Sequence, residues 1–490
     1  MHTASIHTFI HRYRKYLPWV LVTLLIGIGA FLRLYRLEGF AMFLGDQGRD
    51  AIIFKRLITF EHFPAIGAPT SVGQIYMGPF YYYFIAPWLL LTNFNPVGAA
   101  LGVSVVSIIG LWIQFQISKH FFGERTAILG LILTVFSGIL IDFSRFSWNP
   151  NLLPLFMFMT WFATMKAITN RKPIWYFIAG SLFALSLQLH YLAIFFGLPM
   201  ALYFIQEILK HRNDWFHSIV NICISAGGFI LFTMPLILFE FKHQFLNTKS
   251  LLHLSGTQGT LTNPISGMIQ TFIALNTYIF HISLSQVTSI ILLAGFFLII
   301  VSSILLKRNP FFMSIGVFFF CMLLGISFYG GPKYPHYLGP LYIFYLIAIA
   351  YILKECFTKI TMIFLVAFIG IYLFIQFQYM PFLNRPDQGQ INKAQIIAHA
   401  IADHITSKKY SVTSLPHQYS DSTYRYFLEI WGERPIEKDS LEKADELFVV
   451  CEEQCHPIGD PQWDIAYFAP DKIQWQQTIN GNTIYKLTHI

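Results

Sequence analysis

Charged residues are scarce in this sequence of 490 residues. Asp, Glu, Lys and Arg make up only 12% of the chain, whereas hydrophobic residues make up 55%. A soluble domain carries about 25% charged residues, so this composition cannot cover a soluble surface of such size. It also excludes a disordered, collagen-like or small secreted protein. The composition therefore predicts an integral membrane protein.

Cysteine is rare as well, and two common catalytic signatures are missing. Five cysteines do not provide the framework of a disulfide-rich domain. Cys451 and Cys455 lie four positions apart in a polar region, where a disulfide and two free thiols are equally open. Only His456 lies near them, which disfavours a metal site. The chain has neither a glycine-rich phosphate loop nor a serine nucleophile elbow.

Acidic residues are unevenly distributed along the chain. Residues 1–378 contain 23 Lys and Arg but only 10 Asp and Glu, whereas residues 379–490 contain 10 and 15. We predict a membrane domain at 1–378 and a small soluble α/β domain at 379–490. In the second domain we expect helices at 391–406 and 419–431. The strands expected there are 410–415, 446–451, 472–479 and 483–488.

Apolar stretches long enough to form membrane helices recur along the first domain. Eleven are candidate spans: 17–36, 97–117, 125–143, 151–168, 172–188, 191–209, 218–239, 288–306, 311–329, 338–353 and 360–378. A further apolar stretch, 76–91, contains two prolines and several tyrosines, which suit the membrane interface. Whether this stretch crosses the membrane determines the orientation of everything after it.

Basic residues decide this question, because cytoplasmic segments collect Lys and Arg. If 76–91 does not span, 14 of the 23 basic residues before position 379 fall in cytoplasmic segments and 7 in external loops. We read the net charge of +8 as this orientation signal rather than as a sign of nucleic-acid binding. We therefore predict about 11 spans, a cytoplasmic N-terminus and an extracytoplasmic C-terminal domain. The stretch 76–91 and the amphipathic segment 50–60 become interfacial helices in a first external loop, 37–96; a second large external loop covers 241–287.

The few acids of the membrane domain make the search for a site short, because charges near a bilayer are functional candidates. Asp46 and Asp50 lie just past the first span, in the segment LGDQGRD, with Arg49 between them. A structural alternative stays open, in which Asp46 caps a helix and Asp50 pairs with a cation.

Other polar residues recur at the predicted external ends of spans. They are Arg145, Trp148 and Asn149 in SRFSWNPN, His190 and Tyr191 in LQLHY, Glu240, Lys242 and His243 in FEFKH, and Lys333, His336 and Tyr337 in GGPKYPHY. Taken singly, each is typical of a loop or of the membrane interface. As a set, they predict one polar mouth on the external side.

This arrangement resembles the GT-C glycosyltransferases, membrane enzymes that use polyprenyl-phosphate sugars and include protein O-mannosyltransferases and the aminoarabinose transferase of lipid A. The shared features are an external Asp after the first span, a proline-containing aromatic interfacial helix, many further spans and an external C-terminal domain. The segments GDQGRDA, GPFYYYFIAP and LFVVCEEQC resemble an uncharacterised bacterial subgroup of O-mannosyltransferase-like proteins.

The resemblance implies roles for individual residues. Asp46 takes the place of the family's catalytic loop acid, and Arg49 matches an arginine near the donor phosphate. Two positions depart from the pattern: the family's Asp-Glu pair is Asp46-Gln47 here, and the segment Met77-Gly78-Pro79 lacks a lysine found on the interfacial helix. Residues expected near the site on that helix are Gly78, Pro79, Tyr81 and Tyr82.

The predicted function is transfer of a sugar from a polyprenyl-phosphate donor to a lipid, glycan or protein acceptor, with inversion, at the extracytoplasmic face of a bacterial inner membrane. Asp46 is the expected base. The residues expected to contact the donor phosphate or the substrate are Arg49, Asp50, Arg145, His190, Lys333, His336 and Tyr337. Such a donor requires no nucleotide, and the need for a divalent metal stays open.

Two other classes of function remain alternatives. A secondary transporter or flippase for a lipid-linked or polar substrate has a similar number of spans, but places ionisable groups near the midplane and often has internal repeats. A membrane scaffold or receptor predicts that Asp46 and Arg49 can be replaced without effect.

Overall fold

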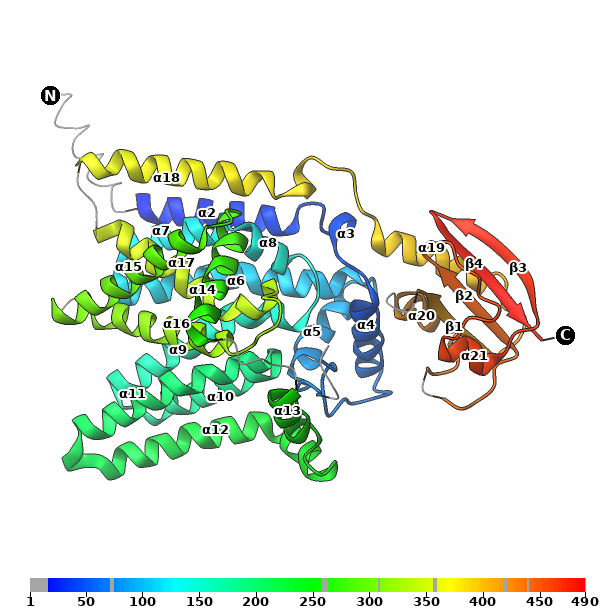
Figure 1. The fold of residues 1–490 in the computed structure, drawn as a ribbon, viewed down its shortest axis with the longest axis horizontal. Helices are drawn as coiled ribbons and strands as arrows, with labels where there is room; N and C mark the ends of the chain where they lie inside the picture. Colours follow the sequence, from blue (N-terminus) through cyan, green and yellow to red (C-terminus); the bar gives the residue numbers. More distant parts are fainter. Residues whose placement is uncertain are drawn as a thin grey trace.

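The computed structural model describes residues 16–489 except 71–74, 258–262, 307–308, 356–358, 417–420 and 439. Most of the described chain is helical, and a bundle of long helices lies beside a smaller domain with a sheet (Figure 1). The bundle contains α2 (Leu17–Leu34), α6 (Val97–Phe122), α7 (Glu124–Phe136), α8 (Gly138–Ser144), α9 (Leu153–Asn170), α10 (Pro173–Leu189), α11 (Gly197–Lys210), α12 (Trp215–Lys242), α15 (Gln286–Leu305), α16 (Pro310–Ser327), α17 (Gly339–Glu355) and α18 (Lys359–Gln378). Short 3-10 helices join them: η1 (Asn149–Leu152), η2 (Tyr191–Phe196), η3 (Arg212–Asp214), η4 (Pro335–Leu338) and η5 (Pro381–Leu383).

Eight helices within the described residues are long and apolar enough to cross a membrane, and α7 with α8 makes a ninth if the pair is one span bent by 64°. The two other predicted spans coincide with shorter apolar helices, α10 and Met362–Gln378 of α18. The structure confirms a polytopic helical membrane domain, but not the predicted number of eleven spans. Five basic residues used to predict the cytoplasmic side lie outside the described residues: Arg12, Arg14, Lys15, Lys307 and Arg308.

The helices of the bundle are apolar on most sides, as a helix between protein and lipid must be. α17 is central, and its side chains Leu341 and Ile347 are fully buried. Leu231 of α12, Leu298 of α15 and Phe364 of α18 are exposed on the surface of the chain. Exposed apolar side chains of this kind suit contact with lipid rather than with water.

The bend between α7 and α8 has a polar partner inside the bundle. The backbone N–H of Gly138 donates a hydrogen bond to Gln376 Oε1 at 2.7 Å, and Gln376 Nε2 donates to the carbonyl of Ile279 at 2.8 Å. A break in a membrane helix frees backbone groups that lipid cannot satisfy. Gln376 of α18 therefore stabilises the bend.

The predicted first external loop contains α3 (Leu37–Phe40), α4 (Gly45–Ile58) and α5 (Phe80–Leu91). The amphipathic segment predicted at 50–60 is the C-terminal part of α4, which begins at Gly45. α5 has 12 residues and is therefore about 18 Å long, whereas a bilayer core is about 30 Å thick. Its length supports the prediction that 76–91 does not cross the membrane.

The predicted second external loop contains α13 (Leu246–Thr257) and α14 (Pro264–Phe280). α14 is not a surface segment, because Phe272, Leu275 and Ile279 are buried in the bundle. Near its N-terminal end, Gly267 lies against the backbone of Ser327, the last residue of α16. At its other end, His281 stacks on Tyr379, directly after α18. The helix therefore runs across the bundle between the C-terminal ends of α16 and α18.

The C-terminal domain is the predicted small α/β unit. Its sheet has the order β1-β2-β4-β3, in which β1 and β2 are parallel and the other neighbours antiparallel. The strands are β1 (Tyr410–Leu415), β2 (Glu446–Cys451), β3 (Lys472–Ile479) and β4 (Asn482–Thr488), and the helices are α19 (Gln390–Ala402), α20 (Ser422–Ile430) and α21 (Trp463–Phe468). One face of the sheet packs with α19 and α20, and the other with α21. Figure 1 shows α19 and α20 on the side of the sheet nearer to the bundle.

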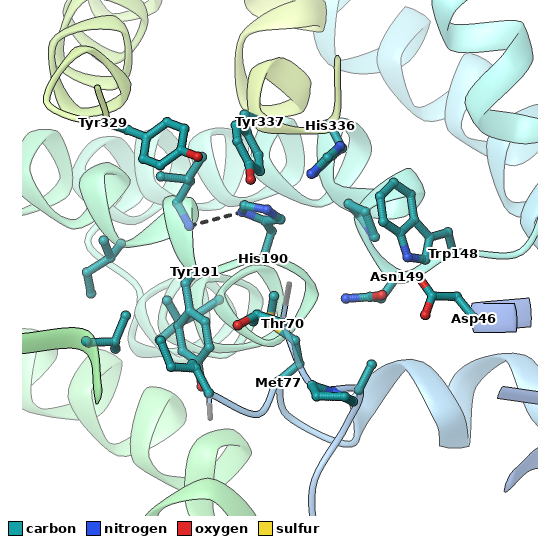
Figure 2. A pocket seen from close by; sticks show the side chains of 18 of the residues that line it. Asp46, Thr70, Met77, Trp148, Asn149, His190, Tyr191, Tyr329, His336 and Tyr337 are labelled. Carbon is teal, nitrogen blue, oxygen red and sulfur yellow. Dashed lines mark hydrogen bonds between the residues drawn. The ribbon is translucent and has the colours of Figure 1, made fainter. Parts of the chain in front are cut away.

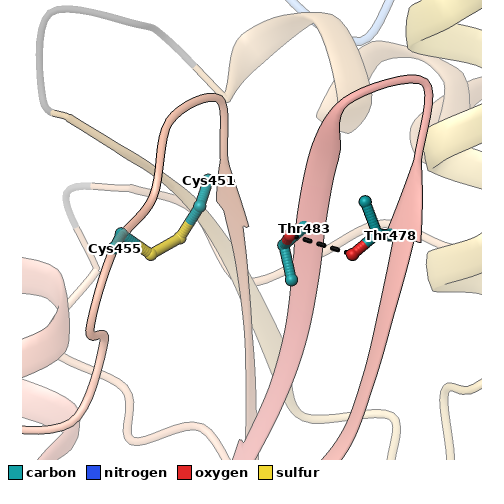
Figure 3. Close-up of a disulfide and its surroundings, with 4 residues drawn as sticks. All are labelled: Cys451, Cys455, Thr478 and Thr483. Atoms are coloured by element: carbon teal, nitrogen blue, oxygen red, sulfur yellow. Dashed lines mark hydrogen bonds between the residues drawn. A yellow bond between two sulfur atoms is a disulfide. The ribbon is translucent and has the colours of Figure 1, made fainter.

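Cys451 and Cys455 are joined in a disulfide in the turn that follows β2 (Figure 3). This is one of the two states that the sequence leaves open. Beside it, the hydroxyls of Thr478 and Thr483 are hydrogen-bonded across the β3–β4 pair at 3.1 Å.

Candidate active site

A cavity of about 570 Å³ lies between the first loop and the loops at one end of the bundle. Its walls come from the start of α4, the segment before α5, η1, the end of α10 with η2, α13, and the loop between α16 and α17. Five of the predicted site residues line it: Asp46, Arg49, His190, His336 and Tyr337. Of the described lining residues, Asp46 is the one acid and Arg49 the one Lys or Arg.

The charged end of the cavity is formed by consecutive turns of α4. Arg49 Nη1 donates to Asp46 Oδ1 at 2.8 Å, while Nη2 and Nε donate to Asp50 Oδ1 at 2.8 and 3.0 Å. The Asp46 side chain is 52% exposed, whereas that of Asp50 is buried and also accepts a hydrogen bond from the Tyr82 hydroxyl at 3.2 Å. Arg49 therefore links an accessible carboxylate to an enclosed one.

Burial and neighbouring charges oppose each other in this group. Burial raises the pKa of Asp50, and the adjacent Arg49 counteracts this shift. Burial alone would lower the pKa of Arg49, but the carboxylates of Asp50 and Asp46 raise it, so Arg49 is a cation at neutral pH. Asp50 Oδ2 is buried and has no hydrogen-bond partner within the described residues.

The structural alternative for Asp46 is half correct. Asp50 pairs with a cation, Arg49, but Asp46 does not cap α4. The N-cap is Leu44, whose N–H donates to Gln47 Oε1 at 3.1 Å. Gln47 is the residue that departs from the family's Asp-Glu pair. Its side chain therefore accepts a hydrogen bond from the backbone N–H of the residue that caps its own helix. The Asp46 carboxylate remains available to the cavity, as Figure 2 shows.

Imidazole and aromatic rings form one wall of the cavity (Figure 2). The ring of His336 lies 4.7 Å from that of Trp148, 5.7 Å from His190 and 4.3 Å from Tyr337, between centroids. His190 Nδ1 accepts a hydrogen bond from the Leu192 N–H at 3.2 Å, so the proton of its neutral ring is on Nε2. Burial, and then the neighbouring His336, lower the pKa of His190 to about 3. His190 is therefore an uncharged hydrogen-bond donor at neutral pH.

The cavity changes character along its length. Asp46 lies beside Trp148 and Asn149, whereas Tyr329 lies at the other side of the view in Figure 2. Apolar side chains line much of the remaining wall: Leu187, Leu192, Ile194, Phe195 and Leu251. One continuous space therefore joins a charged pair on α4 to an apolar surface at the end of the bundle.

Arg145 and Lys333 are not among the lining residues, because each binds backbone carbonyls at a helix end. Arg145 donates to carbonyls at the end of α2, including that of Leu32 at 2.9 Å, and stacks on the Phe382 ring. Lys333 Nζ donates to the carbonyls of Ile326, at 3.0 Å, and Tyr329. Burial lowers the pKa of Lys333 to about 8. Cations are favoured at C-terminal ends of helices, where carbonyls lack partners.

The predicted residues of the interfacial helix support the cavity from behind. A Cβ on Gly78 would lie 2.2 Å from Gln188 Cγ, so a larger residue there would displace the Gln188 side chain, and Pro79 precedes the first turn of α5. The Tyr81 hydroxyl is hydrogen-bonded to Ser147 Oγ at 2.7 Å. None of these residues, nor Tyr82, is among the described lining residues.

Three further residues of the predicted polar mouth line the cavity: Trp148, Asn149 and Tyr191. Glu240, Lys242 and His243 do not. In the SRFSWNPN segment, Arg145 was chosen as the substrate contact, whereas Trp148 and Asn149 are the residues that line the cavity. Thr70, Met77 and Leu251 carry no signal in their local sequence. Within the described residues, no group of three or more His, Cys, Asp or Glu side chains is placed to hold a metal ion.

Comparisons with known proteins agree on one class. The family model described as dolichyl-phosphate-mannose-protein mannosyltransferase matches residues 77–238. ArnT from Cupriavidus metallidurans, solved with bound undecaprenyl phosphate, is similar with a TM-score of 0.61 and 13% identity, over 96% of this chain and 98% of that one. The archaeal oligosaccharyltransferase AglB from Archaeoglobus fulgidus, solved with an inhibitory peptide and a dolichol-phosphate, has a TM-score of 0.53 and 12% identity, over 87% of this chain and 65% of that one. No curated protein matches the chain significantly by sequence.

The structural likeness shows the fold, which is that of the GT-C glycosyltransferases. Together with the family match, it confirms the predicted class: the chain is a multi-pass membrane glycosyltransferase.

Proposed function

We propose that this enzyme transfers a sugar from a polyprenyl-phosphate donor to an acceptor at the extracytoplasmic face of a bacterial plasma membrane, with inversion of the anomeric carbon. The observation that carries the proposal is the cavity that joins the Asp46–Arg49 pair to an apolar wall. Such a space suits a ligand with an anionic head and a hydrocarbon tail. The solved ArnT and AglB structures hold undecaprenyl phosphate and a dolichol-phosphate, respectively.

Asp46 is the proposed base. Its half-exposed carboxylate takes the proton of the acceptor nucleophile as that atom forms a bond to the anomeric carbon. The bond between this carbon and the phosphate oxygen breaks on the opposite face, and the lipid phosphate leaves with the electron pair. One displacement of this kind inverts the anomeric carbon.

Arg49 and the imidazole wall are the proposed stabilisers of the departing phosphate. Arg49 is the one Lys or Arg among the described lining residues, and His190 offers its Nε2–H. Fixed donors of this kind stabilise charge that develops on a leaving group. Because Arg145 and Lys333 bind carbonyls at helix ends, we assign them to the fold rather than to the phosphate. Asp50 has an indirect role, since it orients the Arg49 guanidinium from behind.

The test is an assay of the purified protein in detergent or nanodiscs. It is incubated with a panel of polyprenyl-phosphate sugars and with lipid, glycan and peptide acceptors, and products are identified by mass spectrometry. We expect one donor to be consumed by the wild type and not by Asp46→Asn. Transport of the intact donor across proteoliposome membranes without sugar transfer would refute the proposal in favour of a flippase.

A further inference from the structure

The helix that carries the proposed base is held on one side by the membrane domain and on the other by the C-terminal domain. α4 packs against α5 on one side and against α20 on the other. A Cβ added to Gly48 would lie 2.5 Å from the backbone nitrogen of Thr423 and 2.6 Å from the carbonyl carbon of Ser422. The start of α20 therefore meets the turn that contains Asp46 and Arg49 backbone to backbone.

A second contact holds the residues just before α4. The Phe43 ring packs edge-on against the rings of Tyr426 and Phe427, at 6.1 and 5.9 Å between centroids. The Phe43 N–H donates to Gln390 Oε1 of α19 at 2.8 Å. The chain entering α4 is thus bound to both helices of the C-terminal domain that face the bundle.

A third contact holds the far end of α4. Glu429 of α20 accepts hydrogen bonds from Arg56 Nε at 2.9 Å and from Arg56 Nη2 at 2.7 Å, which engages both carboxylate oxygens. Lys55 Nζ lies 3.3 Å from the same carboxylate. The Glu429 side chain is only 4% exposed, so water screens this pair little. A two-pronged Arg–carboxylate pair also fixes orientation, which a single contact cannot do.

We propose that Glu429 is a positioning residue for sugar transfer: by holding Arg56, it fixes the direction of α4 and hence the place of Asp46 and Arg49 in the cavity. This inference rests on the proposed function of those two residues. α4 has 14 residues and does not cross the bundle, so its direction is set by its neighbours on both sides. The C-terminal domain is then part of the catalytic apparatus, although the described residues that line the cavity include none of its own.

The test compares Glu429→Gln with a matched control, Glu442→Gln. Glu442 belongs to the same domain, pairs with Lys409 at 3.1 Å, and is half exposed. For Glu429→Gln we expect kcat to fall at least 10-fold while the KM for the donor changes less than 3-fold and the protein stays folded. Glu442→Gln should keep kcat within 2-fold. A Glu429→Gln enzyme with kcat within 2-fold of wild type overturns the proposal.

Two further measurements separate positioning from loss of structure. Gly48→Ala leaves every charge in place but pushes against the α20 backbone, so it should lower kcat in the same way. Hydrogen exchange of residues 45–58 should quicken in Glu429→Gln and not in Glu442→Gln, with α6 unchanged in both. Hydrogen exchange does not depend on sugar transfer. An inactive wild type would therefore refute the proposed function, while the exchange measurement would still show whether Glu429 holds α4 in place. Unchanged exchange in Glu429→Gln refutes the positioning role of Glu429.

Discussion

The two arginines of α4 have similar partners in different places. Arg49 bonds the exposed Asp46 (52%) and the enclosed Asp50 (1%), and Arg56 bonds the exposed Glu437 (52%) and the enclosed Glu429 (4%). Of the two exposed carboxylates, Asp46 lines the cavity and Glu437 does not. An exposed carboxylate can exchange its partner for a substrate, whereas removing the partner of an enclosed one leaves a buried charge. The difference teaches that access to the cavity, rather than the ion pair itself, separates the proposed base from a structural contact.

The largest effect is expected from Asp46→Asn, which removes the proposed base and keeps the shape of the side chain. We expect transfer to fall about 10³-fold, within the range for general bases, while binding of undecaprenyl phosphate, followed by native mass spectrometry, stays within about 3-fold. Asp214→Asn is a matched control, because Asp214 is 54% exposed and pairs with Arg171 at 2.9 Å. Equal activity of the Asp46 and Asp214 variants would remove the distinction between the proposed base and a structural contact.

Arg49→Lys should have the next largest effect. A lysine has no planar fork and cannot reach Asp46 and Asp50 together, as Arg49 does through three nitrogens. We expect transfer to fall about 10²-fold, the loss typical for one stabilising donor. Initial rates over a range of donor concentrations measure this. Full activity with lysine would show that one positive charge, without its geometry, is sufficient.

The imidazole wall can be tested by the pH dependence of stability. The unfolded chain binds a proton at His190 near the ordinary pKa of 6.5, and the folded chain does so only near 3. The contribution of His190 to the free energy of unfolding is therefore fully present above pH 6.5. It is lost as the pH falls below 6.5, by at most about 1.4 kcal/mol per pH unit. His190→Gln should show a smaller decrease in melting temperature between pH 7 and 5 than the wild type. His62→Gln, at an exposed position, is the control; identical slopes in all three proteins would contradict the assignment.

Tyr82→Phe should have the smallest effect. It removes one hydrogen bond to the enclosed Asp50 carboxylate, which costs about 1.5–3 kcal/mol of folding free energy, the range for a bond to a charged group. Arg49 keeps its bonds to both carboxylates, so transfer should change less than about 5-fold. Thermal unfolding and the standard transfer assay give the two values. A loss of transfer as large as that of Arg49→Lys would mean that Tyr82 takes part in the reaction.

Local sequence patterns were sufficient to predict the strands of the C-terminal domain. The strands at 410–415, 446–451 and 472–479 were predicted at their observed bounds, because each is a short run of strand-forming residues between turn signals. Asp46 and its neighbour Arg49 were chosen because acids are rare in the membrane domain, and both line the cavity. The structural role of Arg145 could not be predicted, since nothing in its segment shows that it binds the carbonyls at the end of α2.

The count of spans shows a further limit of local patterns. α10 has 17 residues and is short for a membrane span, and the break between α7 and α8 depends on Gln376, which comes much later in the chain. A hydropathy profile gives no information about the contact between Gly138 and Gln376.

The junction of α4 with α20 also concerns how the enzyme is made. Arg56 and Glu429 are 373 residues apart. α4 therefore emerges from the ribosome near the start of synthesis, and α20, which binds it, emerges near the end. All the intervening helices must be inserted, and the last domain folded, before the two meet. On the proposal above, a nascent or truncated chain carries Asp46 and Arg49 on a helix that lacks this contact, and we expect sugar transfer only from the completed chain.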